Sequence, residues 1–519
     1  MPPSSLPPPA PDRFTAALAV CLILPWLNGY TAGPTPNLWP WLVSAFCGVF
    51  VALGWRRVNP RLLALTWLAA ALISSVMALL QYFGLAAALA PWINPTLPGE
   101  AFANLRQRNQ FATLTSMGLV ALLAFVALRT TSTGKVSMPP TPAKRPPLPS
   151  WSYACALLLA LGNAASSSRT GLLQWGLVLV FGLWWNRSSR RSLAGLALLA
   201  LLMYGACVAL LPKLLNLTSG INSAGLWGRL AETGGDSRLV LWHNVLTLIA
   251  QKPWFGWGWG ELDYAHFITA YPGARFTELL DNAHNLPLQL AVELGVPAAV
   301  LVCIGLVWAV RRAAPWRETD PARQMAWAVL AVIGVHSLLE YPLWYGPFQL
   351  ALLLSVAWLW QTRPGPLTGA PAERVSQKSR ISLRITATAA LLLLAYVGFD
   401  YVRVTQLYVP AEKRWPAFQQ DTLAKVQESW LFAPQVRFAI LLTTDVTPAN
   451  APAIQALAQS VLHYSPEAKV VEKLINSASL GGQRADAEFY LARFCWAYPQ
   501  DCAAWMATNT VLLGTASGH

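Results

Sequence analysis

A short polar segment stands directly before an apolar run at residues 281–295, DNAHNLPLQLAVELG. At the N-terminal end of a helix the dipole disfavours a positive charge, so an imidazole at that position is kept neutral. A neutral imidazole can accept a proton from a hydroxyl group. The segment therefore predicts a general base at His284, with Asn285 or the nearby backbone fixing the tautomer of its ring. An ordinary polar helix cap is the alternative interpretation.

Two other blocks place polar side chains at the ends of apolar runs. NLRQRNQFAT, residues 104–113, contains Arg106, Gln107 and Arg108, and HSLLEYPLWY, residues 336–345, contains His336, Glu340 and Tyr341. The spacing of His336 and Glu340 places both on one helix face, as an ion pair or as part of a site. The Tyr-Pro step that follows marks the end of that helix.

Two further arginines suit a phosphate-bearing substrate. Arg169 lies in SSSRT between two apolar runs, and Arg238 lies in DSRLVLWHN. A guanidinium group presents a fork of donors that matches phosphate oxygens, so these arginines beside a neutral base suit a diphosphate leaving group. The expected outer side has no D-D or D-x-D cluster in the sequence, so arginine would take the place of a metal ion and no cofactor is expected.

Some of these residues also have simpler roles. Arg106 and Arg108 could extend to lipid headgroups, and Arg238 could be a surface charge. The Gly-aromatic run FGWGWG, residues 255–260, could be a turn with interface aromatics. His243 and His266 are interpreted as structural or solvated.

The elements that position these residues are membrane helices. The chain of 519 residues is 55% hydrophobic and only 12% charged, whereas soluble domains carry about 25% charged residues. Several runs of roughly 17–22 apolar residues have the length needed to cross a bilayer. We therefore predict an all-α polytopic bundle of about eleven spans. The spans are predicted at 14–29, 37–54, 62–83, 110–128, 151–166, 171–185, 193–211, 285–310, 325–340, 345–360 and 385–400.

The net charge of +14 is concentrated in alternate connectors. The basic connectors are 55–61, 129–150, 186–191, 311–312 and 363–384. Positive connectors stay in the cytoplasm, which places the N-terminus inside a bacterial inner membrane and the C-terminus in the periplasm. Nucleic acid is excluded as a partner because the sequence shows no basic face with interleaved aromatic residues.

The predicted domains follow from this orientation. Residues 1–400 form the transmembrane domain, with a large periplasmic loop at 212–284. Residues 401–519 are far more polar and form a periplasmic helical domain, interpreted as helix-hairpin repeats. In an oxidising compartment Cys495 and Cys502 could form a disulfide.

Longer stretches around these residues resemble a known superfamily. Residues 238–267, RLVLWHNVLTLIAQKPWFGWGWGELDYAHF, and 283–295, AHNLPLQLAVELG, resemble the O-antigen ligases and Wzy-type polymerases, which transfer glycans from undecaprenyl diphosphate. NLRQRNQFATL and HSLLEYPLWYGPF narrow the resemblance to bacterial protein O-oligosaccharyltransferases of the PglL type. The resemblance spans roughly residues 100–350, and a periplasmic C-terminal tail also suits that branch.

The resemblance implies roles for individual residues. It places the essential histidine of the family on His284, its glutamine on Gln107 and its tyrosine on Tyr341. The arginines that hold the diphosphate would be Arg169 and Arg238. One block departs from the family, because residues 106–110 read R-Q-R-N-Q where G-Q-P-N-H is common. The added arginines put the fine specificity for the donor in question.

The sequence thus predicts an inverting, metal-independent transfer of an oligosaccharide from undecaprenyl diphosphate to Ser or Thr of a periplasmic or pilin-like protein. Ligation to lipid A-core, glycan polymerisation and lipid-linked glycan transport are the alternatives. Charges gathered on one rim favour a one-sided enzyme over a transporter. A tail that binds proteins on a membrane anchor is a further alternative, although about eleven spans exceed what an anchor needs.

Overall fold

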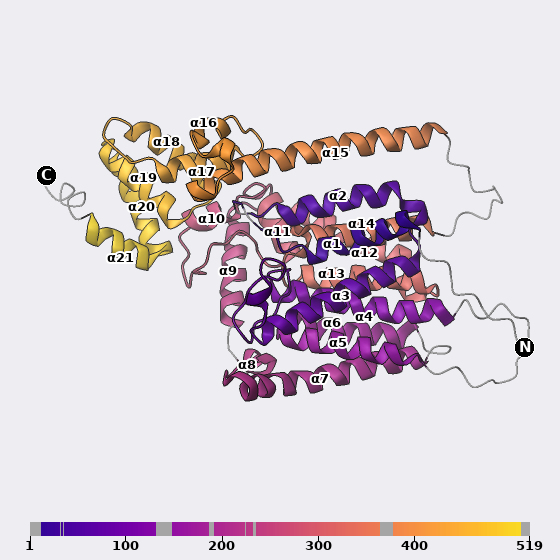
Figure 1. Ribbon diagram of the computed structural model, residues 1–519. Coiled ribbons are helices and arrows are strands. Elements are labelled where there is room, and N and C mark those ends of the chain that lie inside the picture. Colours follow the sequence, from indigo (N-terminus) through magenta and orange to yellow (C-terminus); the bar gives the residue numbers. More distant parts are fainter. Residues whose placement is uncertain are drawn as a thin grey trace, which may run out of the picture. The chain divides into compact units, whose positions relative to one another are not determined.

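The computed structural model describes residues 12–31, 33–34, 36–130, 148–185, 191–223, 225–231, 235–363 and 377–509. Every regular element among these residues is a helix (Figure 1), which confirms the all-α prediction. Most of the basic connectors at 129–150, 186–191 and 363–384 lie outside the described residues.

The chain forms two compact units. Unit 1 comprises Met1–Thr31, Trp39–Glu232 and Val310–Ala395, and unit 2 comprises Ala32–Leu38, Thr233–Ala309 and Tyr396–His519. Part of the segment predicted as a loop therefore belongs to the same unit as the C-terminal tail. The domain boundaries expected from the sequence, at residues 212, 284 and 400, stay predictions.

Unit 1 is a bundle of apolar helices built around α4. Its helices are α1 (Arg13–Leu27), α2 (Trp39–Leu53), α3 (Pro60–Tyr82), α4 (Arg108–Thr130), α5 (Ser150–Ser166), α6 (Arg169–Trp185), α7 (Arg191–Ser219), α8 (Gly225–Ala231), α13 (Pro321–Ser337), α14 (Gly346–Gln361) and the first part of α15 (Gln377–Thr405). Helix α4 packs against α3, α5, α6 and α13, as the side-by-side helices of Figure 1 show. The N-terminal end of α4 carries the Gln107 block, so the centre of the bundle positions that block.

Within the described residues, five helices are long and apolar enough to cross a membrane: α3, α4, α7, α12 and α15. The chain is therefore a multi-pass membrane protein. Helices α1 and α2 are apolar but have 15 residues each, which span about 22 Å of a hydrocarbon core about 30 Å thick. The count of eleven spans stays a prediction, although each predicted span coincides with a helix or a helix pair.

The span predicted at 285–310 is wrong as one continuous helix. Helix α11 (Leu286–Leu294) ends at Gly295, and α12 (Val296–Ala313) begins directly after it. Gly295 has a φ of +90°, and a Cβ there would lie 2.2 Å from the carbonyl oxygen of Trp254. Only glycine permits both this conformation and this close approach, so the helix breaks where the 253–260 loop packs against it.

The Gly-aromatic run is this loop. Its backbone is tied to the end of α11, because Trp257 N donates to Val292 O at 2.8 Å and Gly258 N donates to Glu293 O at 3.0 Å. Trp254 and Phe255 are 72% and 89% exposed. The run is thus a turn, as one interpretation of the sequence had it, and the interface role of its aromatic residues stays a prediction.

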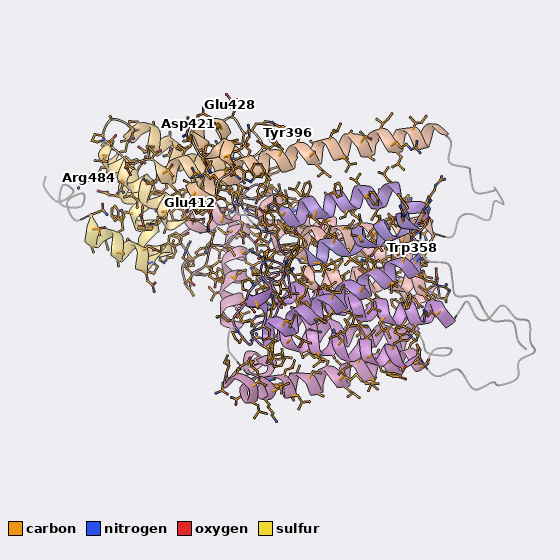
Figure 2. The ribbon with its side chains drawn as sticks, viewed as in Figure 1. Trp358, Tyr396, Glu412, Asp421, Glu428 and Arg484 are labelled. Atoms are coloured by element: carbon orange, nitrogen blue, oxygen red, sulfur yellow. A yellow bond between two sulfur atoms is a disulfide. The ribbon has the colours of Figure 1, made fainter. Side chains whose placement is uncertain are left out.

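Unit 2 combines this region with the C-terminal tail. Its helices are α9 (Gly235–Gln251), α10 (Leu262–Ile268), α11, most of α12, the end of α15, α16 (Thr422–Val426), α17 (Ala433–Thr443), α18 (Ala451–Leu462), α19 (Ala468–Leu480), α20 (Arg484–Ala497) and α21 (Pro499–Thr508). Successive helices from α17 to α21 pack on each other, as in an array of helical hairpins. The charged side chains of Glu412, Asp421, Glu428 and Arg484 point outward (Figure 2).

Helix α10 packs into the core of the C-terminal helices, although it lies about 200 residues earlier in the chain. Phe267 is 1% exposed in a core shared with Leu474 and Phe494. Arg493 Nε donates to the carbonyl oxygen of Ile268 at 3.1 Å, and the ring of Tyr264 stacks on His463 with centroids 3.8 Å apart. The tail therefore supports the segment that leads to His284.

A disulfide joins Cys495 on α20 to Cys502 on α21. The pairing that the sequence allowed is present, and it ties the last two helices of the array together.

Candidate active site

The predicted site residues fall into two sets. His284, Asn285 and Arg238 belong to unit 2. The other candidates, Arg106, Gln107, Arg108, Arg169, His336, Glu340 and Tyr341, belong to unit 1. The arrangement of each set is therefore described within its own unit.

In unit 1 the start of α4 meets the segment after α13 through Glu340. Gln107 Nε2 donates to Glu340 Oε2 at 3.1 Å, and Asn109 Nδ2 donates to Glu340 Oε1 at 2.8 Å. Ser168 Oγ donates to Asn109 Oδ1 at 2.7 Å. Glu340 is only 4% exposed. Three segments far apart in the chain are thus joined by one carboxylate and one amide.

This arrangement determines which atom Gln107 offers to a substrate. A carboxylate only accepts hydrogen bonds, so the amide group of Gln107 must turn its NH₂ toward Glu340. Its Oε1 is then directed away from that carboxylate as an acceptor. Such an oxygen binds an O–H or N–H donor and repels a phosphate. Gln107 Oε1 is therefore the atom of this amide that remains as an acceptor.

His336 and Glu340 bind separate partners. Helix α13 ends at Ser337, and Glu340 N donates to His336 O in one further turn at 2.8 Å. The His336 ring is fully buried, with Nδ1 2.9 Å from Thr113 Oγ1. Gln174 Nε2 donates to the same hydroxyl at 2.9 Å and to Val332 O at 3.1 Å. His336 thus belongs to a polar network that holds α4, α6 and α13 in register.

The arginines of unit 1 differ in their surroundings. Arg108 forms an ion pair with Glu100, and an Nη atom of Arg106 bonds to the hydroxyl of Thr31. Arg169 is exposed at the first position of α6, where Ser168 Oγ accepts a hydrogen bond from Gly171 N at 3.1 Å. An arginine at a helix N-terminus adds its charge to the positive end of the dipole. Of these three residues, Arg169 has the environment best suited to an anion.

Tyr341 follows Glu340 directly and is half-buried. Its φ of −123° and ψ of 54° place it before the short 3₁₀ turn Pro342–Trp344. The helix end expected at the Tyr-Pro step lies earlier, at Ser337, so Glu340 follows α13 instead of sharing a helix face with His336. The Tyr-Pro step itself lies between α13 and α14. Tyr341 is held in position by its neighbour Glu340, which is fixed by Gln107 and Asn109.

In unit 2 His284 lies two residues before α11, as predicted. Asn285 is the N-cap, and its side chain accepts a hydrogen bond from Leu288 N at 3.1 Å. Asn282 Oδ1 accepts from His284 N at 2.9 Å. His284 itself has a φ of +51° and is half-buried. Its ring therefore starts from a fixed, left-handed backbone position at the mouth of a helix.

Arg238 is on α9, which packs against α11. One turn later on the same helix, Trp242 Nε1 donates to the carbonyl oxygen of Ala283 at 3.1 Å. Residues four apart share a helix face, so Arg238 and Trp242 are on the face that meets the His284 segment. Helix α9 thus carries Arg238 one turn before the residue that bonds to the backbone next to His284.

Two titratable groups on α10, Asp263 and His266, are buried in the same unit. Burial, together with the charges of Asp281 and Glu261, raises the pKa of Asp263 to about 7. Burial and the Arg275 guanidinium lower the pKa of His266 to about 3. The neutral His266 ring contacts Tyr271 Oη at 2.8 Å and Phe276 O at 3.0 Å. His266 is structural, as expected.

Residues that sequence reasoning missed hold the site from neighbouring elements. They are Asn109, Thr113, Ser168 and Gln174 in unit 1 and Asn282 and Gln289 in unit 2. All of these residues except Gln174 stand inside the quoted blocks, so their place in the chain was the available signal. Over the described part of the chain, no group of three or more His, Cys, Asp or Glu side chains is suited to a metal ion.

Comparisons with known families cover most of the chain between residues 101 and 511. Residues 101–125 match the protein glycosylation ligase family, and residues 154–303 match the O-antigen ligase family. Residues 324–511 match the C-terminal region of the virulence factor membrane-bound polymerases. The first match contains Gln107 and the second contains Arg169, Arg238 and His284.

Two curated relatives come from Acinetobacter baylyi. The general O-oligosaccharyltransferase is 25% identical over 348 residues, which are 64% of this chain and 55% of that protein. The ComP-specific O-oligosaccharyltransferase is 25% identical over 251 residues, 48% of this chain and 42% of that protein. The chain thus spans about half the length of the curated relatives it matches. These matches confirm that the chain is a relative of the protein O-oligosaccharyltransferases in the O-antigen ligase superfamily.

Proposed function

We propose that the protein transfers a preassembled oligosaccharide from undecaprenyl diphosphate to a Ser or Thr hydroxyl of a periplasmic or pilin-like protein. The observation that carries this proposal is the protein glycosylation ligase match at 101–125, which contains the Gln107 block bonded to Glu340. Both named relatives are O-oligosaccharyltransferases, and one is specific for ComP. The acceptor and the glycan of this chain are inferred by analogy with them.

In the proposed mechanism His284 is the general base. It accepts the proton of the acceptor hydroxyl, whose oxygen then forms a bond to the anomeric carbon of the donor sugar. The bond from that carbon to the diphosphate breaks, and undecaprenyl diphosphate leaves with the bonding electrons. Attack from the face opposite the leaving group inverts the configuration at the anomeric carbon.

The remaining candidates bind the two substrates. Arg169 and Arg238 stabilise the charge that develops on the diphosphate, with Arg106 and Arg108 as additional cations near the donor. Gln107 Oε1 accepts a hydrogen bond from a hydroxyl or amide group of a substrate, and Tyr341 stands beside Glu340 to contact the same substrate. Glu340, Asn285 and His336 support these groups. The reaction as proposed uses no cofactor.

The proposed location is a bacterial inner membrane, with the site and the tail in the periplasm. The alternation of basic connectors supports this orientation. The Cys495–Cys502 disulfide also supports it, because disulfides persist in oxidising compartments.

Lipid A-core ligation is the second candidate function. The O-antigen ligase match over residues 154–303 favours it, since this is the longest family match that contains His284. The two relatives favour a protein acceptor. Polymerisation has the match of residues 324–511 to membrane-bound polymerases in its favour, whereas both named relatives are O-oligosaccharyltransferases. Transport is a weaker candidate because it leaves the cluster at the start of α4 without a role.

The test uses a host that makes a lipid-linked oligosaccharide and a pilin-like acceptor but has no ligase of its own. The intact mass of the acceptor is recorded with the wild-type protein, with His284→Ala and with His243→Ala, an exposed histidine on α9 as control. We expect a glycan-sized mass gain with wild type and His243→Ala only. Glycan on lipid A-core instead of protein would move the assignment to O-antigen ligase, and a gain with His284→Ala would refute the base.

A further inference from the structure

The backbone of His284 is in an unfavourable conformation. A φ of +51° lies in the left-handed region, which is unfavourable for a residue with a Cβ. Such a conformation persists only where the surroundings hold it. The neighbours of His284 should therefore show which groups hold it.

Two side chains bind the peptide groups on either side of Ala283, the residue before His284. Trp242 Nε1 on α9 donates to Ala283 O at 3.1 Å, and Gln289 Oε1 on α11 accepts from Ala283 N at 2.6 Å. Ala283 is fully buried and Gln289 is 1% exposed. The two bonds therefore join two helices through one small buried residue.

These bonds act on the direction of the His284 side chain. The carbonyl of Ala283 shares its peptide plane with the nitrogen of His284, so Trp242 fixes that plane. Gln289 fixes the preceding plane. With both planes held, the φ and ψ angles of Ala283 are determined, and His284 enters its left-handed conformation from a defined position. Asn282 Oδ1 adds a third bond at His284 N, 2.9 Å long.

We propose that Trp242 and Gln289 are positioning residues for His284. They hold its backbone so that the imidazole reaches the acceptor hydroxyl, and neither touches the substrate. This inference rests on the proposed function, in which His284 is the base.

A base must come within about 2.6–3.2 Å of the hydroxyl that it deprotonates. A misplacement of about 1 Å lowers the rate by roughly a hundredfold. Trp242 is also one turn from Arg238 on α9. The same helix thus holds the base through one residue and carries the candidate cation for the leaving group on another.

The test compares Trp242→Phe and Gln289→Leu in full-length purified protein. Phenylalanine keeps an aromatic ring and removes only the N–H donor, while leucine keeps most of the volume of Gln289 and removes the acceptor. The controls are Trp254→Phe and Gln427→Leu, which change exposed residues of the same unit. Transfer is measured from a purified undecaprenyl-diphosphate-linked oligosaccharide to a pilin-like acceptor that the wild-type protein glycosylates.

We expect each variant to lower kcat by about 10- to 100-fold, with the KM for the donor within about twofold of wild type. The controls should retain wild-type kcat. Partial loss of fold would also lower the apparent kcat at constant KM, so the folded fraction of each variant is measured by a melting curve and kcat is expressed per folded enzyme. If one of the two variants does not fold, the kcat of the other tests the positioning role.

The inference is overturned if folded Trp242→Phe or Gln289→Leu retains wild-type kcat, or if the loss appears in KM. His284→Ala in the same assay distinguishes failure of the proposed base from failure of the positioning role. Full activity of His284→Ala would refute the base and with it the proposed mechanism. Inactive His284→Ala beside fully active Trp242→Phe and Gln289→Leu would refute the positioning role alone.

Discussion

Glu340→Gln is a small change with a large expected effect, because it alters which atom Gln107 presents. Glu340 accepts from Gln107 Nε2 and Asn109 Nδ2 at 3.1 and 2.8 Å and is 4% exposed. A glutamine at position 340 offers one acceptor and one donor group. One of the two partner amides must then turn over to avoid a contact between two NH₂ groups.

Asn109 is the less free of the two partners, because its Oδ1 already accepts from Ser168 Oγ at 2.7 Å. Gln107 should therefore turn and present NH₂ where it presented Oε1. A hydrogen bond to a charged group contributes about 1.5–3 kcal/mol, and a mismatched buried pair loses a similar amount. If this free energy is lost from the stabilisation of the transition state, kcat/KM falls by about 10- to 100-fold.

The assay is steady-state transfer by the purified protein, with the double variant Gln107→Glu, Glu340→Gln as the matched rescue. This variant exchanges the carboxylate and the amide between the two positions. The amide now at position 340 can donate to the carboxylate now at position 107 and still accept from Asn109, so position 107 again presents an acceptor oxygen. The double variant should be more active than Glu340→Gln. Wild-type activity of Glu340→Gln, or no recovery in a folded double variant, would refute the reasoning.

Three further predictions concern unit 2. Arg238→Lys keeps the charge but loses the fork, so kcat/KM should fall by about tenfold, and Arg238→Ala should fall further, while Arg484→Ala in the tail should match wild type. Because burial raises the pKa of Asp263 to about 7, the folded unit keeps a proton that the unfolded chain releases, and stability falls as pH rises from about 4 to 7. Asp263→Asn should therefore raise the melting temperature at pH 8, where it increases the free energy of unfolding by up to about 4 kcal/mol, and should have little effect near pH 4. A difference between variant and wild type that does not depend on pH would contradict this cause. Phe267→Ala should destabilise unit 2 by about 3–5 kcal/mol in thermal melting, whereas Phe255→Ala, at an 89% exposed position, should change stability by less than about 0.5 kcal/mol.

Much of the fold was predictable because it depends on near neighbours in the chain. Apolar runs of sufficient length become helices, and each predicted span coincides with a helix or a helix pair. Asn285 and the Leu-Pro step after it signal a helix start, and α11 begins at Leu286. The family blocks are also recognisable from local residue types, which single out His284, Gln107 and Arg238.

The sequence by itself thus determined the helical class, the membrane character and the identity of the candidate residues. Only the tertiary structure decided their partners. Gln107 and Glu340 are 233 residues apart, and Arg493 and Ile268 are 225 residues apart. Whether such residues meet depends on how whole helices pack, which no short segment encodes. The break at Gly295 has the same cause, because the Trp254 carbonyl that requires glycine comes from a loop outside the helix.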